Sequence, residues 1–461
     1  MADAAAPQQA AATQQSADDA AMGDAAVRHL QALLRIDTTN PPGNETPAAE
    51  YLAELLREHG LEPFLDGPVP ERHSVVARLP AAAPRPGLGP LLLHAHLDVV
   101  PADAASWTHP PFGGVIEGGY LWGRGAIDMK HMAVMAALVI GRLARERRPL
   151  GRDVIFAGVA DEEAGSDDGA KFLVDRHPDR VRAEYALGEV GGATIHLGGK
   201  ALYPVQVAEK GVVWMKLRAR GTAGHGSMPR EDNAVARLGD AVARLGRTPL
   251  PHRMTEATAA YIDALAATQQ FPKNLVLQQL KRPALARRIL KMLPDPGAAR
   301  ALAAVLSNTA VPTVLRAGSK TNVIPAVAEA EVDGRSLPGQ TAADLVAEVR
   351  RVVGEGIEVE VVRESTPYST EAASPLWDAI VATVAAHHPG AVCIPYIIPG
   401  FTDAKQWARL GARCYGFAPA RFPDDGTKFA DLFHGKDERI PTEGLRWGAK
   451  VLYDLVVRFA S

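Results

Sequence analysis

The sequence predicts an α/β protein with a mostly parallel sheet and a smaller α+β domain inserted into it. Its 461 residues exceed the usual size of one domain. Apolar strand-like runs alternate with helical patterns along 24–210 and 368–461, which is typical of a parallel sheet with crossover helices. Between them, 211–367 contains strands whose residues alternate between apolar and polar, as in a half-exposed antiparallel sheet.

The larger domain is expected to consist of strands joined by helices. We expect strands at 61–65, 74–79, 91–95, 153–160, 183–188, 392–398 and 412–417, and helices at 25–36, 46–59, 130–146, 170–177, 375–388, 402–410 and from Thr442 onward. Ligands of such sheets bind beyond the carboxyl ends of the strands. Polar residues that follow these strands are therefore the first candidates for a functional site.

The inserted domain has the element order β-α-β-β-α-β of a ferredoxin-like fold. Its expected strands include 212–220, 326–337 and 357–362, and its expected helices are 233–245 and 341–353. A Leu/Ala/Arg-rich region at about 254–306 is poorly patterned for a sheet and predicts a helical excursion.

Composition excludes several classes of function. A net charge of −3 with scattered charges predicts no nucleic-acid partner, and the sequence has no apolar run of about 18 residues that would predict a membrane span. Cys393 and Cys414 form no metal, redox or disulfide motif, so a reducing cytoplasm is the expected location. Residues 1–23 are Ala/Gln/Asp-rich with few large apolar side chains and predict a disordered tail rather than a secretory signal.

The strand LLLHAHLDVVP ends in His94, His96 and Asp98. Polar groups at the end of a buried strand are costly unless they are paired or bind a metal. Side chains two residues apart on a strand point to the same face, so Asp98 can orient His96 as a metal ligand.

Further acidic and imidazole residues follow the other predicted strands. They are Asp128 in GRGAIDMK, Glu162 and Glu163 in DEEAG, Glu189 in ALGEV and His434 in HGKDERIP. Imidazole and carboxylate ligands without thiolates suit zinc, cobalt or manganese in a hydrolytic site. Two cations about 4 Å apart need a bridging carboxylate, for which Asp128 is the candidate. Neighbours on an extended segment point opposite ways, so one of Glu162 and Glu163 can bind metal while the other acts as a general base.

At this point the chain resembles the M20 metallopeptidases, the aminoacylase and glutamate carboxypeptidase group of di-zinc amidohydrolases. Eight segments match the pattern of that family in order: HLDVVP, SWTHPPFGGVIEGGYLWGRGAIDMK, ADEEAG, GTAGHGSMP, NVIP, DGRSLPG, GFTDAK and HGKDERIP. The resemblance extends from about Ala25 to the C-terminus. It implies a zinc-hydrolase catalytic domain and a lid or dimerisation domain.

The resemblance implies a role for each metal-site residue. His96, Asp128 and Glu189 would hold one zinc ion, and Asp128, Glu163 and His434 the other, with cobalt or manganese as possible substitutes. Glu162 would be the general base and Asp98 would orient His96. The Asp128–Met129 peptide is expected to be cis, and His94, which is not a ligand in the family, is interpreted as structural.

The resemblance also places substrate contacts in the inserted domain. His225 would reach the active site of the neighbouring subunit in a homodimer and support the oxyanion. Asn322 and Arg335 would anchor a substrate carboxylate, which the planar fork of an arginine suits. The loop from Gly400 would offer backbone N–H groups at the same end of the substrate.

The expected function is metal-dependent hydrolysis of an amide bond in a small molecule, either an N-acyl amino acid or a peptide with a free C-terminal carboxylate. The helical excursion resembles that of carboxypeptidase S-like and N-fatty-acyl-amino-acid hydrolase members. A dipeptidase is the alternative within the family. A metal-stabilised binding protein without catalysis is the alternative from another class, and it predicts loss of Glu162 or of a ligand, whereas all are present.

Overall fold

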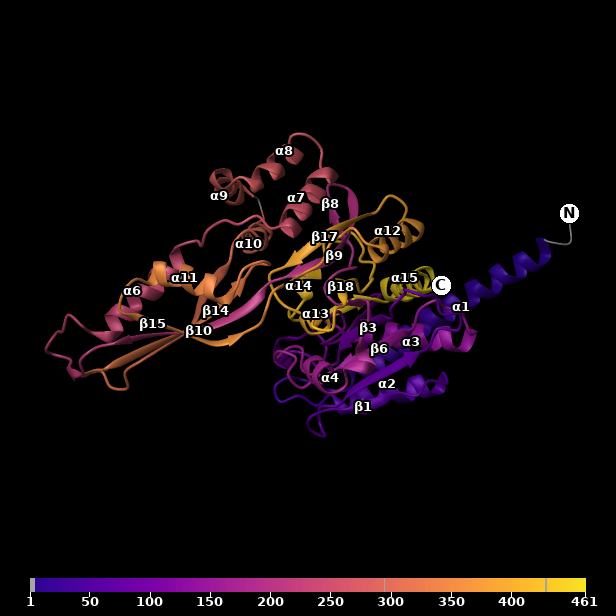
Figure 1. Ribbon diagram of the computed structural model, residues 1–461, viewed down its shortest axis with the longest axis horizontal. Coiled ribbons are helices and arrows are strands. Elements are labelled where there is room, and N and C mark those ends of the chain that lie inside the picture. The colour runs from indigo at the N-terminus through magenta and orange to yellow at the C-terminus, as the bar shows by residue number, and fades with distance from the viewer. Residues whose placement is uncertain (1–4, 294, 428) are drawn as a thin grey trace. The chain divides into compact units, whose positions relative to one another are not determined.

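The structure is a computed structural model that describes residues 5–293, 295–427 and 429–461 (Figure 1). The described residues divide into two compact units. The first holds the chain up to Gln206 together with Thr370–Ile394 and Thr402–Ser461, and the second holds Val207–Ser369 with Pro395–Phe401. Sequence patterning placed these boundaries at 210/211 and 367/368 and did not anticipate that the short segment Pro395–Phe401 joins the second unit.

The first unit is built on a mixed sheet with a parallel centre, which confirms the predicted fold class. The order at the centre is β6 (Val154–Val159), β3 (Leu91–His96), β7 (Tyr185–Gly188) and β18 (Arg413–Gly416), and these four strands are parallel to one another. Antiparallel strands β2 (Ser74–Leu79) and β1 (Phe64–Asp66) extend one side. On the other side lies β9 (Lys200–Glu209), which pairs with β8 (Ile195–Leu197), β16 (Tyr368–Ser369) and β17 (Val392–Ile398). Strand β16 and the last residues of β9 and β17 belong to the second unit.

Helices cover this sheet, and its central strands are therefore buried along their whole length. Every residue of β3, β6 and β7 is buried, as expected of a parallel strand with both faces covered. The helices of the unit are α1 (Ala5–Leu34), α2 (Thr46–Glu58), α3 (Lys130–Glu146), α4 (Ala170–Arg176), α5 (Pro178–Val181), α12 (Pro375–His387), α13 (Ala404–Ala408), α14 (Phe429–Leu432) and α15 (Thr442–Ala460), with a short 3-10 turn, η1, at Ala104–Ser106. Helix α3 contacts β3 and β6, and α15 packs on α1, α3 and α12.

A small three-stranded sheet joins two segments that are distant in the sequence. Its strands are β4 (Val115–Glu117), β5 (Tyr120–Trp122) and β19 (Arg439–Pro441), with Arg439 opposite Trp122. This pairing holds the loop that precedes β19 next to the loop that follows β5. These two loops carry His434 and Asp128, so the small sheet brings both residues to the same place.

Helix α1 corrects the expectation of a disordered tail at 1–23, of which residues 1–4 lie outside the described part of the chain. The helix begins at Ala5 because Ala and Gln have high helix propensity, which the prediction of disorder undervalued. Asp19 anchors it through ion pairs with Arg142 of α3 at 2.8 Å and Lys450 of α15 at 3.0 Å. Met22, Ala26 and Leu30 are buried farther along the helix.

We predict that Asp19→Ala lowers the free energy of unfolding by about 1–3 kcal/mol, because it leaves the buried Arg142 with one carboxylate fewer. Urea unfolding followed by circular dichroism measures this change. Asp18→Ala is the matched control, since the Asp18 contact to Gln14 is at the surface, and its effect should stay within about 0.5 kcal/mol. Equal losses in both variants would contradict the anchoring role of Asp19.

The second unit contains a four-stranded antiparallel sheet in the order β12-β14-β10-β15, which is the ferredoxin-like order and confirms the prediction. Its strands are β10 (Gly211–Arg220), β12 (Thr309–Ala317), β14 (Val327–Ser336) and β15 (Ile357–Glu364). Helices α6 (Ala234–Arg247) and α11 (Ala342–Val353) bury one face of this sheet in a shared core. Strands β9 and β12 were not predicted.

Four helices make up the predicted helical excursion of the second unit. They are α7 (Glu256–Thr268), α8 (Lys273–Gln278), α9 (Pro283–Met292) and α10 (Pro296–Val305), with a 3-10 turn, η2, at Gln279–Lys281. The short strands β11 (Gly224–His225) and β13 (Val323–Ile324) pair separately from the main sheet of this unit. Cys393 and Cys414 form no disulfide in the described structure, and no described helix is long and apolar enough to cross a membrane.

Candidate metal centre

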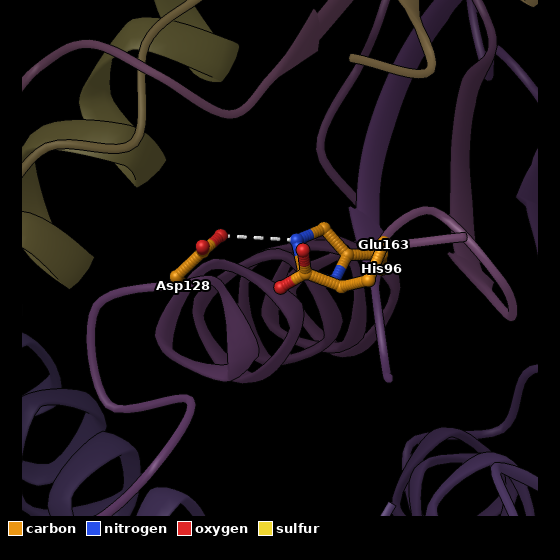
Figure 2. Close-up of side chains that lie close together, drawn as sticks. All are labelled: His96, Asp128 and Glu163. Atoms are coloured by element: carbon orange, nitrogen blue, oxygen red, sulfur yellow. Dashed lines mark hydrogen bonds and ion pairs between the residues drawn. The ribbon is translucent and has the colours of Figure 1, made fainter. Parts of the chain in front are cut away.

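Candidate ligands gather at the carboxyl ends of neighbouring strands in the first unit. His96 is the last residue of β3, Glu162 and Glu163 lie in the turn after β6, and Glu189 follows β7. Asp128 stands just before α3 and faces His96 (Figure 2). Parallel strands end at one edge of the sheet, which is why these segments converge.

Two groups of side chains have the composition and spacing to hold a metal ion. In each group one potential ligand atom per residue lies within 4.8 Å of the others. The groups are His96 with Asp128 and Glu163, and His96 with Glu162 and Glu189.

Asp128 lies between the two histidines and presents one oxygen to each. Its Oδ1 is 3.0 Å from Nε2 of His96, and its Oδ2 is 2.8 Å from Nε2 of His434. Glu189 approaches Nε2 of His96 at 3.6 Å, and Glu163 approaches Nε2 of His434 at 3.3 Å. The residues therefore form two ligand sets that share the Asp128 carboxylate, an arrangement suited to a pair of cations.

Asp98 contacts His96 through both its backbone carbonyl and its carboxylate. The Nδ1 of His96 lies 2.9 Å from the backbone carbonyl of Asp98 and 3.5 Å from its carboxylate. A carbonyl only accepts, so this contact places the proton on Nδ1 and leaves Nε2 as a ligand atom. The carboxylate of Asp98 also accepts from the backbone N–H groups of Glu162 and Glu163, at 3.1 and 3.0 Å, and thereby fixes the turn that carries both residues.

The electrostatics of the centre favour a cation. Burial alone would lower the pKa of His96, but the carboxylates of Asp128, Asp98 and Glu189 raise it well above its usual value. Burial raises the pKa of Glu162 well above its usual range, helped by the charge of Glu189, and burial raises the pKa of Glu189 to about 7. One buried oxygen on each of Glu162, Glu163 and Glu189 has no hydrogen-bond partner in the described structure. Buried carboxylate oxygens without donors fit divalent cations.

Glu438 holds the Asp128 loop and was missed by sequence reasoning. It is fully buried and accepts from the backbone N–H groups of Gly125, Ile127 and Asp128 at 3.0, 2.8 and 3.1 Å. Arg124 donates to the same carboxylate at 2.7 Å. Glu438 lies in the HGKDERIP segment, in which only His434 was predicted to have a role.

We predict that Glu438→Gln weakens metal binding by about 10–100-fold, because the amide cannot accept from all these donors and the Asp128 carboxylate loses its orientation. Competition with a fluorescent chelator measures the affinity. Glu443→Gln is the control, since the Glu443 side chain is 86% exposed and pairs only with Arg446 among the described residues. Unchanged affinity in Glu438→Gln would show that the loop holds its shape without this carboxylate.

Two further buried polar residues adjoin the centre. Asn40 donates to the carboxylate of Asp98 at 2.8 Å and to that of Asp161 at 3.1 Å. Asp403 in GFTDAK is buried, and burial raises its pKa to about 6. Asn40 belongs to a loop with no chemical motif, so nothing in the sequence identified it.

His94 and the Asp128–Met129 peptide match their expected descriptions. His94 is buried against Trp407, and burial lowers its pKa to about 3, which keeps the ring neutral. It belongs to neither group of possible metal ligands. The Asp128–Met129 peptide is cis.

The expected substrate residues lie in the second unit, where contacts of Gly226 and Phe401 connect their segments. His225 is exposed on β11, with Nδ1 2.8 Å from the Ser227 hydroxyl, and the next residue, Gly226, donates its N–H to the Asn322 carbonyl at 2.9 Å. Arg335 lies over the ring of Phe401, the neighbour of Gly400. Arg335 also binds the Asp333 carboxylate through Nε at 2.7 Å and Nη2 at 3.2 Å, which was not foreseen, and its buried Nη1 has no partner in the described structure.

A parallel-centred sheet, an inserted ferredoxin-like domain and a cluster of histidines and carboxylates together define a metallohydrolase. The model of peptidase family M20/M25/M40 matches residues 92–458. The chain belongs to this family and is an enzyme that hydrolyses amide bonds in peptides or amino-acid conjugates.

The matches to curated relatives and to solved structures cover most of this chain. A probable carboxypeptidase S-like 2 from Dictyostelium discoideum is 30% identical over 80% of this chain and 71% of its own, and human N-fatty-acyl-amino acid synthase/hydrolase PM20D1 is 28% identical over 93% and 86%. An M20 family metallo-carboxypeptidase from Sulfolobus solfataricus has the same fold, with a TM-score of 0.69 at 17% identity over 94% of this chain and 98% of its own.

Proposed function

We propose that this enzyme hydrolyses the amide bond of N-acyl amino acids that carry a free carboxylate, with two divalent metal ions, zinc being the expected metal. The observation that carries the proposal is the Asp128 carboxylate, which offers one oxygen to each of two ligand sets. A dinuclear metal-binding M20 peptidase from Bacillus subtilis has the same fold, with a TM-score of 0.58. A shared carboxylate is what two neighbouring cations require.

Five side chains would hold the metals. His96 and Glu189 would complete one set with Asp128, and Glu163 and His434 the other. When bound, the metals supply Lewis-acid polarisation and a water whose pKa is lowered toward about 7.

Glu162 is assigned the role of general base. It is buried near Glu189, and its backbone N–H donates to Asp98, which holds the turn that carries its side chain. Its raised pKa suits a group that accepts a proton from the attacking water and returns it to the leaving nitrogen.

The second unit supplies the groups proposed to bind the substrate. Nη1 of Arg335 is the part of its guanidinium not engaged by Asp333, so it would meet a substrate carboxylate, together with Asn322 and the backbone at Gly400. His225 is exposed, as a residue that serves a neighbouring subunit must be, and we propose a homodimer in which it stabilises the oxyanion.

Hydrolysis of a substrate panel with added zinc tests the specificity. Relatives named N-fatty-acyl-amino acid synthase/hydrolase and aminoacylase-1 support the acyl substrate. We expect turnover of N-acyl amino acids, loss of turnover when the acyl amino acid is presented as its methyl ester, and loss of activity with a chelator. Turnover confined to dipeptides would replace the deacylase with a dipeptidase.

A further inference from the structure

Residues 269–293 of the helical excursion form a strongly basic segment in an otherwise slightly acidic protein. The segment contains six Lys and Arg residues and no Asp or Glu, whereas the whole chain has a net charge of −3. It covers α8, η2 and α9, and both helices contact the η2 turn between them. We call it the basic segment. Figure 1 shows where α8 and α9 lie in the excursion.

Large apolar side chains are exposed at both ends of the basic segment. Phe271 before α8 is 77% exposed and Met292 at the end of α9 is 81% exposed. Leu275 and Val276 of α8 are 53% and 45% exposed. Several large exposed apolar side chains within one short segment are a feature of interaction surfaces.

Helix α9 has an exposed, mostly basic face and a buried or partly buried apolar face. Ala284, Arg287, Arg288, Lys291 and Met292 are exposed and follow the spacing of one helical face. Leu285, Ala286, Ile289 and Leu290 on the other side are buried or partly buried. Among the described residues, neither Arg287 nor Arg288 forms an ion pair. Their charges are therefore available to a partner.

We propose that the exposed side of the basic segment docks on the surface of an anionic lipid bilayer. Lysines and arginines bind the negative headgroups, while bulky apolar side chains such as Phe271 and Met292 enter the boundary with the acyl chains. A second copy of this chain is disfavoured at the same surface, because two basic segments facing each other would repel. Aliphatic rather than mostly aromatic side chains favour lipid over a nucleic acid, whose bases stack on rings.

A surface that docks on lipid was not expected from the sequence, which predicted no membrane partner. That expectation rested on the low net charge and on the lack of an apolar run of about 18 residues. Neither criterion detects a short surface segment that combines local charge with a few exposed apolar residues.

Co-sedimentation of the full-length, metal-loaded enzyme with vesicles tests the proposal. We expect binding to phosphatidylcholine vesicles that contain about one third phosphatidylglycerol, and binding at least about tenfold weaker to pure phosphatidylcholine. Raising the salt concentration should weaken the binding, because it screens exposed charges. Equal binding to both kinds of vesicle, or no binding to the anionic ones, would overturn the proposal.

Paired variants locate the binding surface. R287E together with R288E should reduce anionic vesicle binding at least about tenfold. R350E together with R351E is the matched control, because these adjacent arginines are exposed on α11 in the same unit and the change in charge is identical. F271S with M292S should also weaken binding, whereas L315S, at a residue 57% exposed on β12, should not.

Folding and assembly are checked on the same samples. Circular dichroism and the mass measured by light scattering should be the same for wild type, R287E/R288E and R350E/R351E. If the control pair loses as much vesicle binding as R287E/R288E, general electrostatics rather than the basic segment is responsible. If R287E/R288E changes the mass of the protein and leaves vesicle binding intact, the surface contacts another protein chain and the proposal is wrong.

Discussion

Glu162→Gln is expected to lower kcat by about 10²–10⁴-fold while two metal ions per subunit remain bound. The amide retains the shape of the side chain but cannot accept the proton of the attacking water. The turn itself should persist, because the Asp98 carboxylate accepts from the backbone N–H groups of Glu162 and Glu163 rather than from the Glu162 side chain. Steady-state kinetics and elemental analysis of the same preparation measure both quantities.

Glu163→Gln is the informative comparison for this prediction. The two residues are neighbours in the same turn, and the substitution is the same. Glu163 contacts His434 at 3.3 Å, so its replacement should release metal as well as activity. Glu162 lies close enough to His96 and Glu189 to be a ligand instead. If Glu162→Gln loses metal and Glu163→Gln does not, the two roles must be exchanged. Full activity in Glu162→Gln would also exclude it as the base.

The sequence indicated most of the candidate ligands because they stand at the ends of strands. His96 is the last residue of β3, Glu162 and Glu189 follow β6 and β7, and the parallel order of those strands makes the residues neighbours. The ferredoxin-like topology of the second unit was predictable for a similar reason. Alternating strands such as β10 and β14 show one buried face and one polar face in the sequence itself.

The partners that hold these residues could not be predicted. The sequence around Glu438 is polar and predicts a solvated side chain. In the fold, its carboxylate accepts from three backbone N–H groups and from Arg124. The acceptor for His96 is a backbone carbonyl, which exists at every residue and leaves no trace in the sequence. The pairing of Arg335 with Asp333 was overlooked although the two lie on the same face of β14.

Helix α1 shows the limit of reading disorder from composition. Few large apolar residues lie before Met22, so composition predicts that the segment cannot bury enough apolar surface to fold. It is anchored instead by one acidic residue, Asp19, whose basic partners lie far away in α3 and α15. Complementary charges over such separations cannot be matched from a single sequence.

Asp128→Asn should weaken the binding of both metals, by at least about 100-fold each, whereas a change in an unshared ligand should affect mainly one. The reason is geometric: the two oxygens of Asp128 face His96 and His434 separately. An amide offers one carbonyl oxygen and no negative charge, so it cannot serve both sets. Metal titration followed by calorimetry should give two binding steps for wild type, and at most weak binding for the variant.

Glu189→Gln is the control for Asp128→Asn, because Glu189 approaches only His96 among the two histidines, at 3.6 Å. It should lose one binding step and keep the other. Thermal unfolding provides a second readout: a metal present at 100 times its Kd stabilises the folded state by about 2.7 kcal/mol. A chelator should therefore lower the Tm of wild type markedly, that of Glu189→Gln less, and that of Asp128→Asn hardly at all. If Asp128→Asn still binds one metal with wild-type affinity, the two sets do not share this carboxylate.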